Sequence, residues 1–278
     1  MQNILIASFC LVTIVSVVFI LVMRKYVRRE GFEMFADDLK PESFCLAGLG
    51  LTSVSSSWRN DPVPKIIHQT APSEKWKWHS IWEHCQKTWL ERFPGFEYKM
   101  WTDEDIEDLI KNRFKRFYPI YKAYPKNIYR IDAFRYFVLY EYGGIYADMD
   151  YECVQNFYSL LPNGKVSIAE SAIAGEDYQN ALMASPRHHP FWMYVISDVI
   201  DHRHLIGPVE ATGPEVIIRV AKKVPYGMLN PLPESQFSVE TVPLPSEYHT
   251  PNTFQPSSRT DVYAIHHGTC SYCTDILS

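Results

Sequence analysis

The chain has 278 residues, of which 46% are hydrophobic, and its formal net charge is −5. This hydrophobic content argues against a disordered chain and suits one sizeable domain with appendages. The negative balance excludes the basic footprint of a nucleic-acid-binding protein. Six widely spread cysteines do not resemble a disulfide framework, and the lone Cys270-x-x-Cys273 pair lacks the second pair that a zinc site needs.

The first apolar stretch predicts a membrane anchor. Residues 4–23 contain no charged side chain, and their length matches the hydrocarbon core of a bilayer. A signal peptide is the alternative, but no basic residue precedes the stretch and no clear small-residue cleavage site follows it. We therefore predict a single-pass transmembrane helix at residues 4–23 and a stem or linker over residues 24–61.

Residues 62–278 form the predicted catalytic domain. Residues 63–70 show the pattern of a buried strand followed by its loop, and residues 96–101 alternate like a second strand. We expect a helix over residues 73–92 with Ser73 as its cap. Thr102, with acidic residues directly after it, predicts the start of the next helix.

The stretch from Ile128 to Glu152 organises the rest of the chain. Its first part reads as a helix with an apolar stripe formed by Ile131, Phe134, Val138 and Tyr142. Asp132 and Arg135 are neighbours on the helix surface at the edge of that stripe, so we expect them to be partly buried and to pair with each other or with a ligand. Gly143-Gly144 then ends the helix.

A short apolar strand follows and leads into three acidic residues. In an extended chain Asp148, Asp150 and Glu152 point to one side, where they repel one another unless a cation lies between them. Carboxylate oxygens suit Mg²⁺ or Mn²⁺. A solvated acidic sheet edge is the alternative, but ligands of open α/β sheets bind at the carboxyl ends of strands.

The remaining elements are shorter. We expect strands near residues 153–154, at 165–170 and at 261–265, a helix from His189-Pro190 through Ile200, and a helix opened by Pro214. His266 and His267 directly follow the last of these strands.

Four motifs resemble the DXD-containing glycosyltransferases of family 32, which include yeast outer-chain mannosyltransferases, inositol-phosphoceramide mannosyltransferases and α1,4-galactosyl/N-acetylglucosaminyltransferases. The motifs are PKIIHQ at residues 64–69, Arg130-x-Asp132-x-x-Arg135, LYEYGGIYADMD at residues 139–150, and TGP at residues 212–214. The resemblance implies an α/β protein with a GT-A fold, meaning a Rossmann-like nucleotide-sugar-binding domain. It also implies a nucleotide-sugar donor and a divalent metal, Mn²⁺ or Mg²⁺.

The same resemblance implies roles for individual residues. Asp150 is expected to be the principal metal ligand, with Asp148 on the metal's water shell or the ribose. His266 is expected to help hold the metal and diphosphate, although His267 stays open as the alternative. Asp132 and Arg135 would hydrogen-bond sugar hydroxyls. The other expected donor-binding residues are His68, Gln69, Thr70 and Asn180, although a histidine such as His68 is more often a hydrogen-bonded core residue.

The implied reaction is hexosyl transfer with retention of anomeric configuration to a glycan or glycolipid acceptor. GDP-mannose is favoured over a UDP-hexose donor because this sequence resembles the mannosyltransferases of the family more than the other members. The resemblance also suggests a Golgi membrane protein with a lumenal domain. Arg24, Lys25, Arg28 and Arg29 follow the apolar stretch, however, and the positive-inside tendency places that side in the cytoplasm. The orientation stays open.

Two other functions fit the acidic motif less well. An aspartate phosphatase also places D-x-D after an apolar strand, but a small hydroxyl residue usually follows the second aspartate, and here Tyr151-Glu152 follows. A catalytically silent carbohydrate-binding membrane protein is the second alternative. The intact acidic set argues against it.

Overall fold

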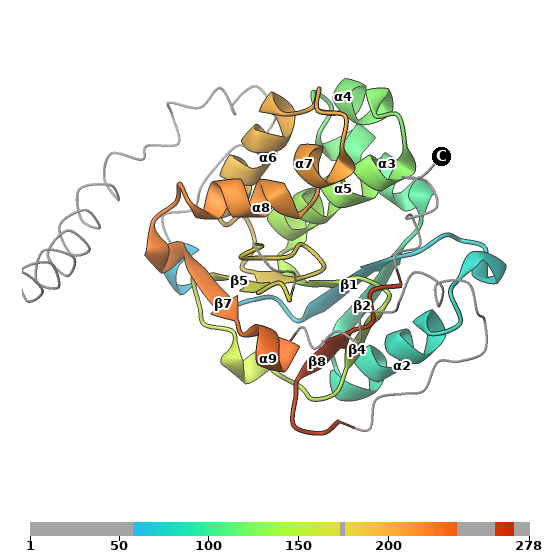
Figure 1. Ribbon diagram of the computed structural model, residues 1–278, viewed down its shortest axis with the longest axis vertical. Helices are drawn as coiled ribbons and strands as arrows, with labels where there is room; N and C mark the ends of the chain where they lie inside the picture. The colour runs from blue at the N-terminus through green and yellow to red at the C-terminus, as the bar shows by residue number, and fades with distance from the viewer. Residues whose placement is uncertain (1–57, 173–175, 238–258, 270–278) are drawn as a thin grey trace, which may run out of the picture. The chain divides into compact units, whose positions relative to one another are not determined.

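A six-stranded mixed sheet lies at the centre of the computed structural model, in the order β2-β1-β3-β6-β5-β7 (Figure 1). The structure describes residues 58–172, 176–237 and 259–269. Strand β6 is antiparallel to both of its neighbours, whereas β1 is parallel to β2 and β3, and β5 is parallel to β7. Five of the strands therefore share one direction and end at the same edge. The strands are β1 (Ile66–Thr70), β2 (Glu97–Trp101), β3 (Gly144–Ala147), β5 (Val166–Ala169), β6 (Leu182–Ser185) and β7 (Leu229–Leu232).

Within the part of the chain that the structure describes, six helices cover one face of this sheet (Figure 1). They share a hydrophobic cluster with strand residues that include Tyr146, Ile168 and Met183. Helix α5 lies between the sheet and α6 and is the longest of them. The helices are α3 (Asp103–Arg113), α4 (Tyr118–Ala123), α5 (Asn127–Tyr142), α6 (Phe191–Asp201), α7 (Pro208–Ala211) and α8 (Pro214–Ala221).

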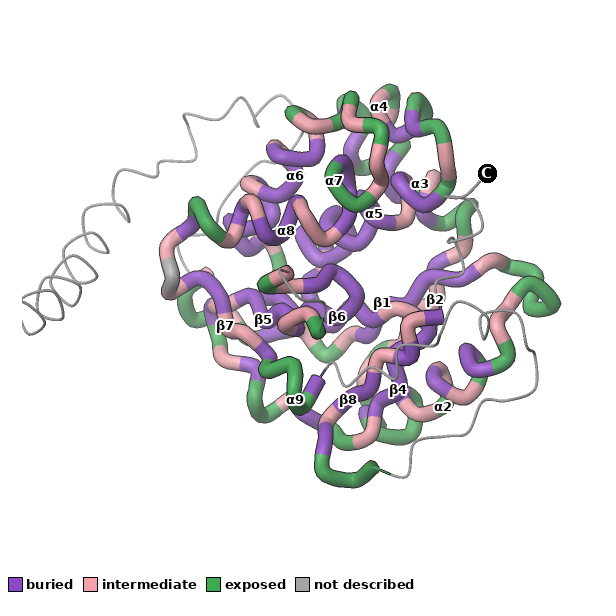
Figure 2. Tube along the Cα trace, viewed as in Figure 1, coloured by how far each residue is buried: buried purple, intermediate pink, exposed green. Residues whose placement is uncertain are grey.

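The opposite face is covered by α2 (Trp82–Arg92), α9 (Glu234–Phe237) and a small antiparallel pair, β4 (Tyr151–Cys153) with β8 (Ala264–His266). Ile145 and Ala147 join the cluster on this face, whereas Tyr146 between them joins the cluster on the other, as the period of two in a strand requires. Figure 2 shows buried residues, in purple, on both sides of the sheet. Short 3₁₀ turns complete the described part: η3 (Trp58–Asn60), η4 (Lys75–Lys77), η5 (Tyr158–Leu160) and η6 (Tyr226–Met228).

Many of the predicted helices and strands are confirmed. Strands β1, β2 and β5 and helix α6 lie where the sequence patterns placed them, and Pro214 opens α8. Thr102 caps α3 through a capping box with Asp105, in which each side chain bonds the other residue's backbone N–H. The sheet with helices on both faces confirms the predicted α/β class.

Two local predictions were wrong. Residues 73–92 do not form one helix, because η4 occupies Lys75–Lys77 and α2 begins only at Trp82. Trp78 Nε1 donates to the Pro72 carbonyl at 2.7 Å, which closes this stretch into a loop. The single apolar stripe on α5 was the second error: that helix is buried on nearly all sides, since the sheet and α6 cover it together.

Gly143 and Gly144 connect α5 to β3, as predicted. Both have positive φ, at 65° and 93°. A Cβ on Gly144 would lie 2.6 Å from the Ile66 carbonyl oxygen on the neighbouring strand. Glycine at this position therefore lets β3 pair closely with β1.

The predicted anchor at residues 4–23, nearly all of the stem and Cys270-x-x-Cys273 lie outside the described residues. Within the described ranges, no helix combines the length and the apolar character that a membrane span needs.

Candidate functional site

Polar side chains converge where β1 and β3 end at the shared sheet edge. Tyr146 Oη donates to Asp148 Oδ1 at 2.8 Å, and Thr70 Oγ1 lies 3.2 Å from the same tyrosine oxygen. Gln69 Nε2 donates to the Asp148 backbone carbonyl at 3.2 Å. The pairing of β1 with β3 thus brings two predicted donor-binding residues, Gln69 and Thr70, to Asp148.

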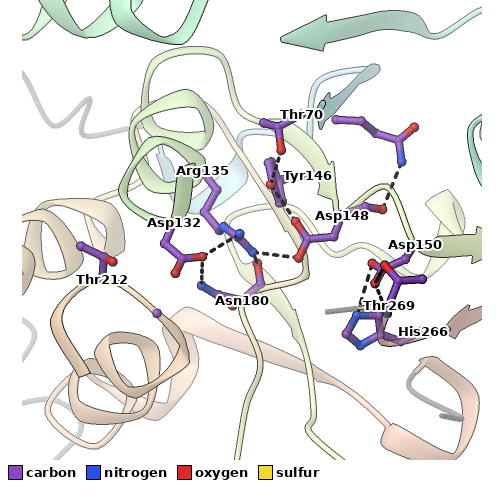
Figure 3. A network of polar contacts seen from close by, with 12 residues as sticks. Thr70, Asp132, Arg135, Tyr146, Asp148, Asp150, Asn180, Thr212, His266 and Thr269 are labelled. Atoms are coloured by element: carbon purple, nitrogen blue, oxygen red, sulfur yellow. Dashed lines mark hydrogen bonds and ion pairs between the residues drawn. The ribbon is translucent and has the colours of Figure 1, made fainter. Parts of the chain in front are cut away.

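Helix α5 supplies the second half of this network (Figure 3). Arg135 Nη2 lies 2.7 Å from Asp132 Oδ1, and Arg135 Nη1 lies 3.1 Å from Asp148 Oδ2. The same Nη1 donates to the Asn180 carbonyl at 2.8 Å, and Asn180 Nδ2 donates to Asp132 Oδ1 at 3.3 Å. One guanidinium therefore joins α5, the end of β3 and the segment before β6.

This arrangement is electrostatically unbalanced. Burial raises the pKa of Asp132 and that of Asp148, although the positive charge of Arg135 opposes both shifts. The carboxylates in turn raise the pKa of Arg135 despite its burial, so it stays charged. Asp132 and Arg135 are buried, whereas 26% of the Asp148 side chain is exposed. One cation among two acids leaves a site suited to further positive charge or to hydroxyl donors.

The acidic residues do not lie on one side of an extended strand, and that prediction was wrong. Strand β3 ends at Ala147, and Asp148-Met149-Asp150 forms a turn in which Tyr151 N donates to the Asp148 carbonyl at 3.0 Å. Each acid has its own protein partners. Met149, in the middle of the turn, packs with Trp82 and Cys85 in a separate hydrophobic cluster.

Asp150 turns toward the C-terminal segment (Figure 3). Its Oδ2 accepts from Thr269 N at 2.8 Å and from Thr269 Oγ1 at 3.0 Å. Its Oδ1 lies 3.4 Å from His266 Nε2. Burial opposes ionisation of Asp150, but the His266 charge and the bonds from His266 and Thr269 hold its pKa below the usual range. Asp150 is therefore an ionised carboxylate beside an imidazole.

Glu152 has separate partners. Its Oε2 lies 2.9 Å from His267 Nε2, and its Oε1 lies 3.3 Å from His84 Nε2. Hydrogen bonds from these histidines hold its pKa below the usual range although burial opposes the shift. The structure thus brings His266 to Asp150 and His267 to Glu152.

The donor set fits a divalent cation in part. Asp150 and His266 supply one oxygen and one nitrogen side by side, which are donors that Mn²⁺ accepts. Asp148, the third predicted ligand, is engaged with Arg135 and Tyr146. Over the described ranges, no group of three or more His, Cys, Asp or Glu side chains is arranged to hold a metal ion.

The structure does not place the His68 side chain in this network. His68 is fully buried, its Nε2 lies 2.9 Å from the Gly143 carbonyl, and Trp101 Nε1 donates to its Nδ1 at 3.1 Å. Burial lowers its pKa to about 4. His68 is a core histidine that links β1, β2 and the end of α5.

Two residues at the site were not predicted from the sequence. Tyr146 precedes Asp148 by two positions, so the period of two along a strand could have placed both on one side. Thr269 bonds Asp150 across 119 residues of sequence, and no local pattern indicates such a contact.

Comparison with known proteins identifies the region that carries these residues. Residues 80–167 match the family model described as the glycosyltransferase sugar-binding region containing a DXD motif. This range includes Asp132, Arg135, Asp148 and Asp150. The resemblance to DXD-containing glycosyltransferases is thereby confirmed.

Several relatives are yeast mannosyltransferases. Inositol phosphoceramide mannosyltransferase 2 of Schizosaccharomyces pombe is 34% identical over 170 residues, which cover 60% of this chain and 47% of the relative. Inositol phosphoceramide mannosyltransferase 3 of the same yeast is 37% identical over 142 residues, covering 49% of this chain and 37% of the relative. The initiation-specific alpha-1,6-mannosyltransferase of Candida albicans is 31% identical over 94 residues, covering 32% of this chain and 24% of the relative. The chain thus spans less than half the length of each of these relatives.

Proposed function

We propose that this protein transfers a hexose from a nucleotide sugar to a glycan or glycolipid, because residues 80–167 match the glycosyltransferase sugar-binding region containing a DXD motif. The observation that carries the proposal is the contact of Arg135 with both Asp132 and Asp148. It connects the two halves of the motif at the edge where parallel strands end. Ligands of open α/β sheets bind at such an edge. The GT-A arrangement is part of this proposal.

The chemical problem in this reaction is charge. A nucleoside diphosphate leaves as an anion while the sugar ring becomes electron-poor. Asp150 and His266 would hold a divalent cation, which supplies Lewis-acid stabilisation of the diphosphate when bound. Arg135 holds Asp148 and Asp132 in place and opposes the rise in their pKa that burial causes, and Asp132 with Arg135 would hydrogen-bond the hydroxyls of the donor sugar.

We propose GDP-mannose as the donor and an inositol-phosphate-containing glycolipid as the acceptor. The names of the first relatives, inositol phosphoceramide mannosyltransferases, support mannose as the sugar and an inositol phosphoceramide as the acceptor. A UDP-hexose donor is the alternative. We expect the transfer to retain the anomeric configuration without a covalent glycosyl-enzyme, because no candidate nucleophile stands out in the sequence.

The proposed membrane location rests on the sequence alone. Residues 4–23 would anchor the protein in an endomembrane such as the Golgi, near a lipid acceptor. Carbonate extraction of the full-length protein tests this directly. Recovery in the soluble fraction would contradict the anchor.

A donor panel tests the function. The full-length protein, purified in detergent, is incubated with Mn²⁺ and either GDP-mannose, UDP-galactose or UDP-N-acetylglucosamine. We expect GDP-mannose to give the largest rise in melting temperature and, with an inositol phosphoceramide acceptor, a mannosylated product. Chelation of the metal should abolish product formation. A protein that binds sugar but turns over none of the donors would instead be the silent carbohydrate-binding protein.

A further inference from the structure

Helix α2 lies against the segment that follows β8, on the side of the sheet opposite α5 (Figure 1). Two side chains of α2 make polar contacts on this side. One contacts the segment that follows β8, and the other contacts Glu152, which hydrogen-bonds that segment. Trp82 Nε1 donates to Thr269 Oγ1 at 3.2 Å, and His84 Nε2 lies 3.3 Å from Glu152, which bonds His267. The polar contacts of Trp82 and His84 therefore reach the site through Thr269 and Glu152.

The first of these connections has a fixed direction. The carboxylate of Asp150 can only accept, so the single hydroxyl proton of Thr269 points to Asp150 Oδ2. The lone pairs of the same hydroxyl then accept the indole N–H of Trp82. All three residues are buried, with 7% of Trp82, 8% of Asp150 and 9% of Thr269 exposed. Hydrogen bonds in such a setting are well defined because water does not compete for them.

These hydrogen bonds fix the orientation of the Asp150 carboxylate. One oxygen, Oδ2, accepts from the Thr269 backbone N–H and hydroxyl, and the other, Oδ1, lies 3.4 Å from His266 Nε2. Tilting the carboxylate plane away from this orientation would weaken both bonds to Thr269. In the second connection, Glu152 hydrogen-bonds His267, the residue next to His266, and His84 Nε2 lies 3.3 Å from the other Glu152 oxygen.

We propose that Trp82 and Thr269 are positioning residues, which hold Asp150 so that its Oδ1 stays beside His266. The inference rests on the proposed function, in which Asp150 and His266 bind the divalent cation. Thr269 acts on Asp150 directly, and Trp82 acts through Thr269. Neither residue contacts the cation in this proposal.

The test is a Mn²⁺ titration of the full-length protein followed by melting temperature, without donor or acceptor. Thr269→Val keeps the side-chain volume and removes the hydroxyl, whereas Thr269→Ser keeps the hydroxyl. We expect Thr269→Val to raise the Mn²⁺ concentration at half-maximal stabilisation about tenfold, which corresponds to about 1.4 kcal/mol. Thr269→Ser should stay close to the unsubstituted protein. Trp82→Phe should shift the same midpoint in the same direction by less.

Trp192→Phe is the matched control. Trp192 is also a buried tryptophan, and its Nε1 donates to Ser185 Oγ at 2.8 Å on the other side of the sheet. This variant should lower the melting temperature and leave the Mn²⁺ midpoint unchanged. The proposal is overturned if Trp82→Phe behaves like this control, or if Thr269→Val and Thr269→Ser give the same midpoint. Absence of any Mn²⁺ effect on the unsubstituted protein overturns the metal site itself and the positioning role with it.

Discussion

Arg135 Nη1 on helix α5 lies 3.1 Å from Asp148 Oδ2 at the end of strand β3. This contact joins the two parts of the Asp132–Asp150 motif across the glycine turn, and the same guanidinium also holds Asp132. A buried ion pair of this kind contributes little net stability over an apolar alternative, because desolvation of the charges offsets their attraction. A functional reason for retaining it is therefore the simpler explanation.

Replacement of Asp150 by asparagine should nearly abolish transfer while the fold survives. Asparagine keeps the shape and can still accept from Thr269, but it lacks the charge that holds a cation beside His266. We expect Mn²⁺ to raise the melting temperature of the unsubstituted protein and to leave that of Asp150→Asn unchanged. Full activity of Asp150→Asn in chelator-treated buffer would refute the metal mechanism.

Asp198→Asn serves as the control for that experiment. Asp198 is a buried carboxylate on α6 that accepts from Arg219 Nε at 2.9 Å. It lies in the helical layer beyond α5. This variant should lose stability and keep its response to Mn²⁺.

Truncation of Arg135 or Asp132 to alanine should affect both stability and catalysis. Removal of Arg135 leaves Asp132 and Asp148 without a positive partner, which costs roughly 3–5 kcal/mol. Removal of Asp132 should cost less, because Arg135 stays paired with Asp148. In the surviving folded protein we expect a higher KM for the donor and a lower kcat, because the pair would contact the sugar. Denaturant unfolding and donor kinetics are measured together. Unchanged kinetics with reduced stability would show that the pair is only structural.

Stability should fall as the pH drops from 6.5 to 4, in part because of His68. Its Nε2–H donates to the Gly143 carbonyl and its Nδ1 accepts from Trp101, so the neutral ring is fixed from both sides. The pKa is lowered from 6.5 to about 4 by burial. In this interval the unfolded state binds a proton that the folded state does not, so the free energy of unfolding rises with pH. The contribution of His68 to this difference in free energy is on the order of 3 kcal/mol.

His68→Gln tests this assignment. Glutamine can donate and accept in the same places but does not titrate, so the pH dependence of unfolding between pH 4 and 6.5 should become shallower. His189, whose pKa burial also lowers to about 4, accounts for part of the remaining slope. His204→Gln, at an exposed position, is the control. The KM of His68→Gln for the donor should match that of the unsubstituted protein. A large rise in this KM would indicate that His68 contacts the donor.

Gly144→Ala should destabilise the fold more than Gly95→Ala. Both glycines have positive φ, so alanine at either position is strained by roughly 1–2 kcal/mol. Only at Gly144 does the new Cβ meet backbone, 2.6 Å from the Ile66 carbonyl oxygen, whereas nothing lies within 4 Å at Gly95. The difference between the two unfolding free energies measures the close approach of β1 and β3. Equal losses of unfolding free energy in the two variants would show that backbone strain, and not the contact with Ile66, causes the destabilisation.

Local chemistry was sufficient for much of the fold. The glycine pair that ends α5, the Thr102 cap, and the short strands β1 and β2 follow from rules that involve a few neighbouring residues. The Asp132–Arg135 pair was also predictable, since residues three apart on a helix are neighbours.

Longer-range packing decided the arrangement of the acids and histidines. The sequence determined that Asp148, Asp150 and Glu152 follow a buried strand near Arg135, because helix and strand periods are local properties. Only the tertiary structure decided that a turn at Met149 separates the three acids, that His266 meets Asp150 and that His267 meets Glu152. The physical reason is distance along the chain: Glu152 and His267 are 115 residues apart, and Asp150 and Thr269 are 119 apart. Packing of α2 and β8 against the turn selects these partners, and no local pattern encodes that packing.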